Sequence, residues 1–556
     1  MRTLTQRTNR NIMHQNRNSQ YAFCQLNSPV LLLLLCPLLF AIPTIPCQAE
    51  SPNIILIMAD DLGFSDLGCY GSEIQTPHLD QLAKDGLRFS QFYNAGRCCP
   101  TRASLMTGLY PHQAGIGWMN RNDKLPAYQG ELNQHCVSIP QVLSPAGYQC
   151  YHVGKWHLTY RMREANENWP LGRGFLRAYG TGGGGNYFAP RPLYEDNQHI
   201  QPPQQDYYVT DAFSQRAVEY LKDHAQNQPQ QPFFMYLAYT APHFPLHAWP
   251  KDIARYRGKY LKGWDQFRKQ RHQKMQNLGL INSPLSPRDP DAKSWESLTE
   301  TEQQEWDLRM SVYAAMITSM DRGIGQVLQQ LDEMKATDNT LVLLLSDNGA
   351  SAEYIDRGHQ PGAVTGTRES FRCAEVGWAN TSNTPFRFHK MWMHEGGIST
   401  PLIARWPEQI KQTGDWTQQT GHVVDLLATF VDITKAEYPK TRNGKQITPL
   451  AGISLLPTFH HPEQTKPRTL FWEHEGNKAI HEGNWKLVKE DQHDWELYDL
   501  SQDRSELNDL AKSQPERSAA LADVWQAWAE KVGVVPWEQL PPPGYRSKGP
   551  DFYRKK

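Results

Sequence analysis

The sequence predicts an α/β fold in which a large mixed, mostly parallel sheet lies between helix layers and a smaller C-terminal α+β subdomain follows. Three observations support this prediction. Wholly apolar runs end in acidic residues, strand and helix patterns alternate along most of the chain, and short, closely spaced strand patterns replace them near the C-terminus. A continuous apolar run is typical of a central parallel strand, and the alternation indicates a sheet covered by helices on both faces.

Residues 1–49 have the pattern of a signal peptide and not of a folded element. The region before residue 28 holds four arginines and no acid, and the apolar run from Val30 to Ile42 is too short to span a bilayer. Ala49 follows at a suitable cleavage point; an uncleaved anchor or a buried helix is the alternative. We therefore expect an exported protein, periplasmic or secreted, without a stable membrane anchor.

Composition and charge exclude several classes of protein. The 57 Lys and Arg residues balance 58 Asp and Glu residues, which argues against a nucleic-acid binder that depends on a basic surface. A hydrophobic share of 39% and a charged share of 21% fit a globular chain and do not fit a disordered one. Nine cysteines among 556 residues are too few for a disulfide scaffold. We therefore expect a large apolar core and no nucleic-acid partner.

The expected elements of the sheet follow one another from the start of the mature chain. Asn53–Ala59 is an apolar strand that ends at Asp60-Asp61. Thr76-Pro77 begins a helix, because Pro is favoured at the first helical position, and Gly86 ends it. Apolar runs and helical spacing then predict strands at 87–93, 148–153, 233–239 and 341–345, and helices near 210–224, within 299–335 and at 423–433.

Two segments interrupt this alternation. Pro250–Glu296 is polar and basic, and Ala350–His394 is rich in Gly, Asn and aromatic residues. Long insertions in an α/β core usually lie at the rim of the active cleft. For residues 250–296 a solvated surface excursion is an equal alternative.

A domain boundary is predicted where Pro-containing breaks near Pro457 and Pro467 end the large-sheet pattern. It divides residues 50–457 from a C-terminal subdomain at residues 458–556. Short strands are expected there at 469–472, 485–488 and 495–500, followed by a helix near 516–532 and an extended tail from Pro541.

Two pairs of polar residues each follow an apolar strand. Asp60-Asp61 ends the first strand, and Asp347-Asn348 follows the strand at 341–345. The carboxyl ends of parallel strands meet at one edge of a sheet, so four oxygen ligands would converge there, and carboxylates so close repel unless a cation neutralises them. An all-oxygen set favours Ca²⁺ or Mg²⁺ over zinc. The alternative, that each pair only caps the next helix or turn, is weakened because two pairs stand in equivalent places.

The segment Arg97-Cys98-Cys99-Pro100-Thr101-Arg102 is the most specific feature of the sequence. Pro100 and Thr101 are expected to begin a helix that runs to Gly108. Cys98 would then face the cleft near the helix N-terminus, where a developing negative charge is favoured. A vicinal disulfide or two buried thiols are the structural alternatives, since neither a CxxC motif nor a zinc spacing is present.

Further cationic and imidazole side chains follow the other strands or lie in the second insertion. Gly154-Lys155-Trp156-His157 comes after one strand, His243 comes after another, and Lys390 precedes His394. A single His or Lys in such a place is more often structural. Arg102, Lys155 and Lys390 together would form an anion pocket beside a metal, which suits a tetrahedral group such as sulfate or phosphate.

With these motifs, the sequence resembles the formylglycine-dependent sulfatases of the alkaline phosphatase superfamily, and among them the bacterial arylsulfatase-like enzymes. Cys98-Cys99-Pro100-Thr101-Arg102 matches the family's Cys-x-Pro-x-Arg signature, with Thr101 where Ser is more usual. The flanking Leu105–Gly108 and Tyr110–His112 match as well, and segments 154–157, 239–243 and 394–398 are similar to later motifs. The resemblance runs from about Asn53 to about Leu510, and implies an alkaline phosphatase-like fold with residues 50–457 as the catalytic domain.

The resemblance also implies a mechanism. A separate maturation enzyme would oxidise Cys98 to formylglycine, an aldehyde whose hydrate attacks the sulfur of a sulfate ester and then releases sulfate. The divalent cation would be held by Asp60, Asp61, Asp347, Asn348 and the modified Cys98. Arg102 and Lys155 would stabilise the diol and the sulfate, His157 would assist deprotonation of the diol, and His243 and Lys390 would contact the sulfate and help to protonate the leaving oxygen.

The sequence leaves the substrate, the cation and the competing functions open. A sulfated small molecule or carbohydrate is expected, and Gly182–Phe188 with the aromatic insertions would shape its pocket, although a plain flexible loop is an equal interpretation. Ca²⁺ is slightly favoured over Mg²⁺, because it accepts more oxygen ligands. The alternatives are a phosphodiester or phosphonate monoester hydrolase on the same scaffold, which the lack of a second metal set disfavours, and a catalytically inactive secreted metal-binding protein.

Overall fold

The computed structural model describes residues 51–541, and its main sheet confirms the α/β class. The predicted signal peptide and the tail after Pro541 lie outside the described residues. The sheet has eleven strands, in the order β10 (Trp416–Thr417), β2 (Leu87–Tyr93), β9 (Ser399–Arg405), β8 (Thr340–Ser346), β1 (Asn53–Asp60), β7 (Phe233–Pro242), β3 (Gln149–Lys155), β4 (Arg177–Thr181), β5 (Leu193–Glu195) and β6 (Gln198–Ile200), with β11 (Gly421–His422) beside β2.

The central strands β8, β1, β7, β3 and β4 are all parallel, while β9, β5 and β6 are antiparallel to their neighbours. The register pairs Ala59 of β1 with Ser346 of β8. Between its first and last residues each of these strands is wholly apolar, as expected of strands buried on both faces. This register brings the polar residues after β1 and those after β8 to the same level of the sheet.

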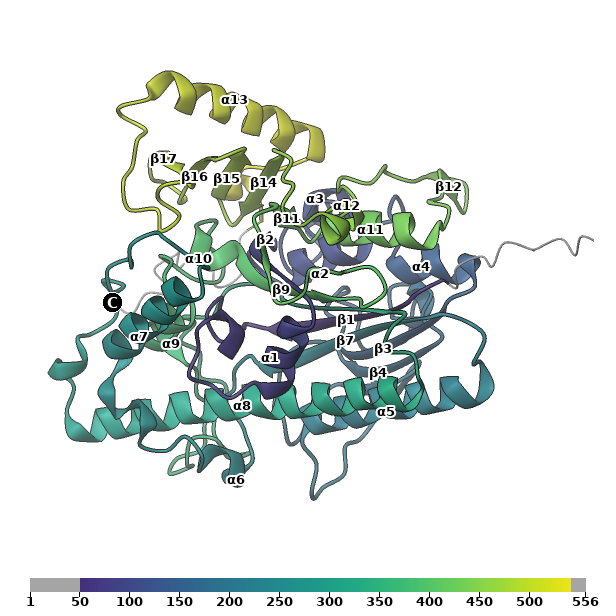
Figure 1. Cartoon of the computed structure of the whole chain (residues 1–556), viewed down its shortest axis with the longest axis horizontal. Helices are drawn as coiled ribbons and strands as arrows, with labels where there is room; N and C mark the ends of the chain where they lie inside the picture. Colours follow the sequence, from purple (N-terminus) through teal and green to yellow (C-terminus); the bar gives the residue numbers. More distant parts are fainter. Residues whose placement is uncertain (1–50, 542–556) are drawn as a thin grey trace, which may run out of the picture. The chain divides into compact units, whose positions relative to one another are not determined.

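Two apolar cores lie on the two faces of the sheet, because alternate side chains of a strand point to opposite faces. Ile55 and Ile57 pack with α1 (Pro77–Lys84), α5 (Val209–Asn227) and α8 (Glu300–Glu333). Ile54 and Leu56 pack with α2 (Cys98–Thr107), α4 (Ile139–Leu143) and α11 (Asp425–Thr434). Figure 1 shows these two helix layers on either side of the strands.

The long helix α8 begins where its sequence predicts. The side chain of Thr299 accepts a hydrogen bond from the backbone N–H of Glu302, and the side chain of Glu302 accepts one from the backbone N–H of Thr299. These two reciprocal bonds form a capping box. Its apolar residues at helical spacing are buried: Met310, Tyr313, Ala314 and Ile317. Shorter helices complete this region: α3 (Pro111–Ala114), α6 (Pro250–Ile253), α7 (Trp264–Asn277), α9 (Glu375–Ser382), α10 (Glu395–Ile398) and α12 (Leu456–His460), with a small hairpin of β12 (Thr441–Arg442) and β13 (Lys445–Gln446).

The segment 250–296 is not the solvated excursion that its polar composition allowed. Trp264, Phe267 and Met275 of α7 are buried in the apolar core. Arg271 is buried too, and its charge is balanced by Asp66 at 2.7 Å and Glu73 at 2.9 Å. The few apolar residues share one helix face, so a segment that is polar on average still packs as core.

The C-terminal subdomain is a four-stranded antiparallel sheet with one helix. Its strands are β14 (Thr469–His474), β15 (Asn477–Glu482), β16 (Trp485–Lys489) and β17 (Glu496–Asp499), and α13 (Pro515–Val532) packs on it through Trp525 and Trp528. The sequence analysis missed β15, because Lys, His and Glu interrupt its apolar pattern. Within residues 51–541, every helix is too short or too polar to cross a membrane.

Candidate active site

The carboxyl ends of β1 and β8 hold four polar residues in one place. Asp60, Asp61, Asp347 and Asn348 are each at most 2% exposed. The backbone N–H of Asp61 donates to Asp347 Oδ1 at 3.2 Å, and Asn348 Nδ2 donates to Asp61 Oδ1 at 2.6 Å. Asp61 has a φ of +64°, a conformation that non-glycine residues adopt at a cost and that often marks a functional site. We call these four residues the strand-end cluster.

Each carboxylate of the strand-end cluster has a cationic partner from elsewhere in the chain. Lys155, the last residue of β3, lies 2.6 Å from Asp60. Arg102 of α2 lies 2.7 Å from Asp347, and Lys390 lies 2.9 Å from Asp61. All three cations are buried, so water does not screen these pairs.

The strand-end cluster fits a hard divalent cation. Asp60 Oδ1 and Asn348 Oδ1 are buried but have no hydrogen-bond partner among the described residues. Burial and the charge of Asp60 raise the pKa of Asp347 to about 7, so the protein alone does not fully neutralise the repulsion between these carboxylates. Unpaired, converging oxygen atoms are the ligands that Ca²⁺ and Mg²⁺ prefer.

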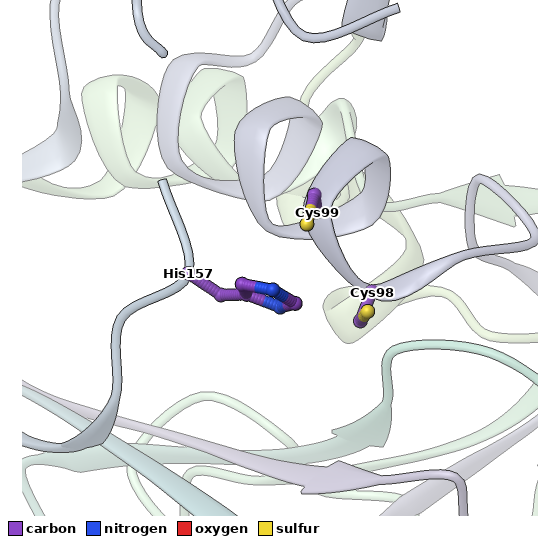
Figure 2. A group of neighbouring side chains, drawn as sticks. All are labelled: Cys98, Cys99 and His157. Carbon is purple, nitrogen blue, oxygen red and sulfur yellow. The ribbon is translucent and has the colours of Figure 1, made fainter. Parts of the chain in front are cut away.

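Cys98 is the first residue of α2, and its thiol lies near that of Cys99 and near the imidazole of His157 (Figure 2). The helix begins two residues before Pro100, where the sequence predicted its start. Pro100 is therefore the third residue of the helix, and this position tolerates proline because the first four backbone N–H groups of a helix have no partner within it. A hydrogen bond from Cys99, together with the positive charge of Lys155, holds the pKa of Cys98 well below its usual range. All six cysteines among residues 51–541 are free thiols, so the vicinal disulfide alternative is excluded in this structure.

Two histidines border the same site. His157 follows β3 in a left-handed conformation with a φ of +57°, and its imidazole points toward the first turn of α2. His243 Nε2 lies 3.6 Å from Asp61 Oδ2. Burial lowers the pKa of each imidazole to about 4, so both rings are neutral near pH 7. A neutral imidazole can accept a proton, which is what a general base requires.

The structure therefore brings all ten predicted site residues together, and it adds residues that the sequence analysis missed. Glu353 lies 2.9 Å from Lys390 and 3.2 Å from Arg97. Burial alone would raise the pKa of Glu353, but the charges of Lys390 and Arg97 lower it to about 2. Glu353 stands in an irregular stretch of the second insertion, where no periodicity signals its position. The placement of Glu353 and Lys390 does agree with an insertion at the rim of the site.

The C-terminal subdomain also reaches the site. His474 ends β14 and is fully buried, and its two ring nitrogens have no hydrogen-bond partner among the described residues. Burial lowers the pKa of His474 well below its usual range, and the positive charge of Arg97 lowers it further. The glycine-rich loop Gly182–Phe188 also reaches the site, since a Cβ added to Gly184 would lie 3.0 Å from His243 Nδ1.

Comparison with known proteins agrees with this geometry. A family model described as Sulfatase matches residues 52–436, and one described as N-sulphoglucosamine sulphohydrolase, C-terminal, matches residues 386–530. The chain is 35% identical to an uncharacterised sulfatase of Schizosaccharomyces pombe, with 88% of this chain and 95% of that protein covered. It is 32% identical to an arylsulfatase of Klebsiella aerogenes, with 73% and 92% covered. Among solved structures, that of Ps i-CgsB in complex with k-i-k-neocarrahexaose has a TM-score of 0.65 at 27% identity, covering 86% and 93%.

Proposed function

The chain belongs to the sulfatase family and is a sulfuric ester hydrolase, and we propose that it acts through a formylglycine made from Cys98 beside a divalent cation. One observation carries the proposal. Cys98 begins α2 within a signature that also contains Arg102, and Arg102 lies 2.7 Å from Asp347 in the strand-end cluster. A modifiable cysteine, an oxygen cluster suited to a cation and three buried basic residues therefore lie in one site.

The cation would be held by the four residues of the strand-end cluster and by the modified Cys98. When bound, it would neutralise their repulsion and favour the ionised form of the nucleophile. Ca²⁺ is favoured over Mg²⁺, because this many oxygen ligands exceeds what Mg²⁺ usually takes from protein side chains.

Hydrated formylglycine supplies two hydroxyl groups: one attacks the ester sulfur, and loss of the proton of the other releases sulfate and restores the aldehyde. His157 is neutral and beside Cys98, so it is placed to accept that proton. Arg102 and Lys155 flank the same point with fixed positive charge and would hold the sulfate oxygens. An unmodified Cys98, or a serine there, lacks the second hydroxyl and so lacks this route to release.

His243 and Lys390 would act on the leaving group. Both contact Asp61, at 3.6 Å and 2.9 Å, so both approach one part of the site. Although burial opposes its charge, Asp61 and Glu353 raise the pKa of Lys390 well above its usual range, so Lys390 stays protonated. A hydrogen bond from Lys390 to the ester oxygen would stabilise the negative charge that develops as the sulfur–oxygen bond breaks. Nδ1 of His243 faces the carbonyl oxygen of Phe244, which only accepts, so His243 would donate through Nε2 only when its ring is protonated.

The proposed substrate is the sulfate ester of a carbohydrate, with a sulfated small molecule as the second candidate. The solved structure of Ps i-CgsB is in complex with a hexaose, which supports a sugar. In this chain, Phe244 and Phe371 form a partly exposed aromatic pair, 6.2 Å apart, beside His243 and Lys390. An aromatic face accommodates a sugar ring as well as an aryl ring.

Peptide mass analysis tests the proposal most directly. The full chain is expressed together with a formylglycine-generating enzyme, and the mass of the peptide that contains Cys98 is measured. We expect the aldehyde at Cys98, and a cysteine thiol in an active preparation would overturn the mechanism. Turnover of an aryl sulfate and of an aryl phosphodiester by the same preparation then separates sulfatase from phosphodiesterase activity, since the sulfate should be hydrolysed faster.

The proposed export rests on the sequence of residues 1–49. If these residues are removed as a signal peptide, the protein isolated from a producing cell begins close to Glu50 and is recovered outside the cytoplasm. Sequencing of its N-terminus checks both points.

A further inference from the structure

Two cysteines and one histidine form a second set of potential ligands within the site. Cys98 and Cys99 are the first two residues of α2, and His157 follows β3. Their sulfur atoms and an imidazole nitrogen all lie within 4.8 Å of one another. Figure 2 shows the imidazole directed toward the first turn of the helix, where both thiols are located. The proposed hydrolysis uses Cys98 and His157 but gives Cys99 no role.

All three side chains are available as ligands. The two cysteines are at most 2% exposed and are not joined by a disulfide. His157 Nδ1 is buried without a hydrogen-bond partner among the described residues, and its strained backbone holds the ring in this position. Thiolate sulfur and neutral imidazole are the ligands that zinc and similar soft cations prefer, whereas the strand-end cluster offers only oxygen.

The electrostatic surroundings do not oppose a second cation. The positive charges nearest to the cysteines are already paired, Lys155 with Asp60 at 2.6 Å and Arg102 with Asp347 at 2.7 Å. When bound to a divalent ion, the two cysteines are thiolates with two negative charges, so the ion and its sulfur ligands together are neutral. The low dielectric of this site therefore places no large penalty on binding.

We propose that the chain in which Cys98 is still a thiol binds one thiophilic divalent cation, of the class of Zn²⁺, through Cys98, Cys99 and His157. Tetrahedral bonds of the usual lengths place two sulfur atoms about 3.8 Å apart and a sulfur and a nitrogen about 3.6 Å apart. Since the ligand atoms lie within 4.8 Å of one another, the side chains must close by no more than about 1 Å. Three protein ligands leave the fourth position for water or an anion, as in catalytic zinc sites. Conversion of Cys98 to an aldehyde removes one ligand, so this soft site and the formylglycine exclude each other.

Cobalt titration of the unconverted protein tests the proposal. The full chain is produced without a maturation enzyme, the thiol at Cys98 is verified by mass, and Co²⁺ is added as a spectroscopic probe. We expect one equivalent to bind with sulfur-to-cobalt charge-transfer absorption of the strength of two thiolates, and Zn²⁺ should displace it. Absorption of one thiolate or none would overturn the proposal, and this readout needs no variant.

Variants then assign the ligands. Cys99→Ser and His157→Ala should each weaken Co²⁺ binding at least about tenfold, while Cys136→Ser, which removes a buried thiol elsewhere, should not. Equal affinity in Cys99→Ser and the unaltered protein would contradict the proposed site. An excess of Ca²⁺ should leave the cobalt absorption unchanged, and displacement by Ca²⁺ would mean that cobalt occupies the strand-end cluster.

The outcome is independent of the proposed hydrolysis. Cobalt binding is measured on the thiol form without substrate, whereas sulfatase activity is measured on the converted form. Failure of the cobalt experiment leaves the formylglycine mechanism intact, and a thiol at Cys98 in active enzyme would overturn that mechanism without affecting the soft site.

Discussion

Two groups of charged side chains are equally buried in this molecule but differ in the charges that surround their carboxylates. In the strand-end cluster, Asp60 Oδ1 and Asn348 Oδ1 have no hydrogen-bond partner among the described residues. A second group joins α10 to the C-terminal subdomain, and we call it the interface cluster. In it, Lys486 Nζ lies 2.9 Å from Glu395 and 2.8 Å from Glu506, and Arg504 lies 3.0 Å from Glu395.

The pKa values of the acids show the consequence. Burial alone would raise the pKa of Glu395, but Lys486 and Arg504 lower it to about 2. By contrast, burial and the charge of Asp60 raise the pKa of Asp347 to about 7. Burial therefore does not decide the direction of the shift. Glu395 is stabilised as an anion because it faces two cations. Asp347 faces Arg102 but also the charge of Asp60, so part of the repulsion between the two acids remains, and a further cation would remove it. The first arrangement joins α10 to the C-terminal subdomain, and the second is the one that we propose holds a metal ion.

The largest expected effect comes from the nucleophile. Replacing Cys98 by serine should lower kcat at least about 1000-fold, because a single hydroxyl cannot release sulfate by collapse to an aldehyde. Steady-state hydrolysis of an aryl sulfate measures the loss, and mass analysis should find sulfate retained on the serine. Cys136→Ser, a buried cysteine away from the site, is the control and should remain active. Turnover by Cys98→Ser within tenfold of the unaltered enzyme would contradict the proposed chemistry.

The interface cluster should respond in stability. Glu395→Gln leaves Lys486 and Arg504 buried with one acid fewer, so the free energy of unfolding should fall by about 3 kcal/mol. Urea denaturation of the full chain measures the change. Glu482→Gln removes an exposed acid from the same small sheet and should have almost no effect. A loss as small as that of the control would show that the pairing around Glu395 contributes little.

These two groups also show how far the sequence could predict the molecule. Strand ends are marked by apolar runs that stop at Asp60 and Asp347, so convergence of the strand-end cluster followed from the parallel topology. Glu395 lies in a motif that the sequence analysis linked to the active site, but its partners are Lys486 and Arg504, far along the chain.

Glu353 and His474 could not be found in this way. Each reaches the site from an irregular insertion or from another subdomain, and their positions depend on packing between segments distant in sequence. Local periodicity carries no information on such contacts. The strands, by contrast, are marked by local apolar runs, which is why a mostly parallel sheet was predicted and these two residues were not.

Acid should act on the interface cluster in a defined pH range. The folded-state pKa of Glu395 is depressed to about 2 from an ordinary value of 4.5, so its contribution is complete above pH 4.5 and is lost as the pH falls toward 2. This contribution is on the order of 3 kcal/mol. Between pH 6 and pH 3, the free energy of unfolding should fall less steeply in Glu395→Gln than in the unaltered protein. The same slope in both proteins would assign the acid sensitivity to other groups.

A divalent cation should stabilise the strand-end cluster and leave the interface cluster unaffected. Ca²⁺ at 100 times its Kd should add about 2.7 kcal/mol to the free energy of unfolding, and a chelator should remove the gain. Asp347→Asn should lose this response, while Glu395→Gln should keep it in full, because only the first variant alters a proposed ligand. A response that survives in Asp347→Asn would place the cation elsewhere.

The smallest expected effect tests whether the backbone near the site is as closely fitted as its charges. A Cβ added to Gly184 would lie 3.0 Å from Nδ1 and 3.1 Å from Cε1 of His243, whereas one added to Gly185 would meet nothing within 4 Å. Neither glycine has a φ in the left-handed region, so contact with His243 is the main difference between the two substitutions. Gly184→Ala must displace the imidazole by a few tenths of an ångström, which should lower kcat/KM about tenfold, while Gly185→Ala should leave it unchanged. Equal activity of the two variants would show that His243 tolerates such a shift, and its role in the proposed reaction would then not depend on its exact position.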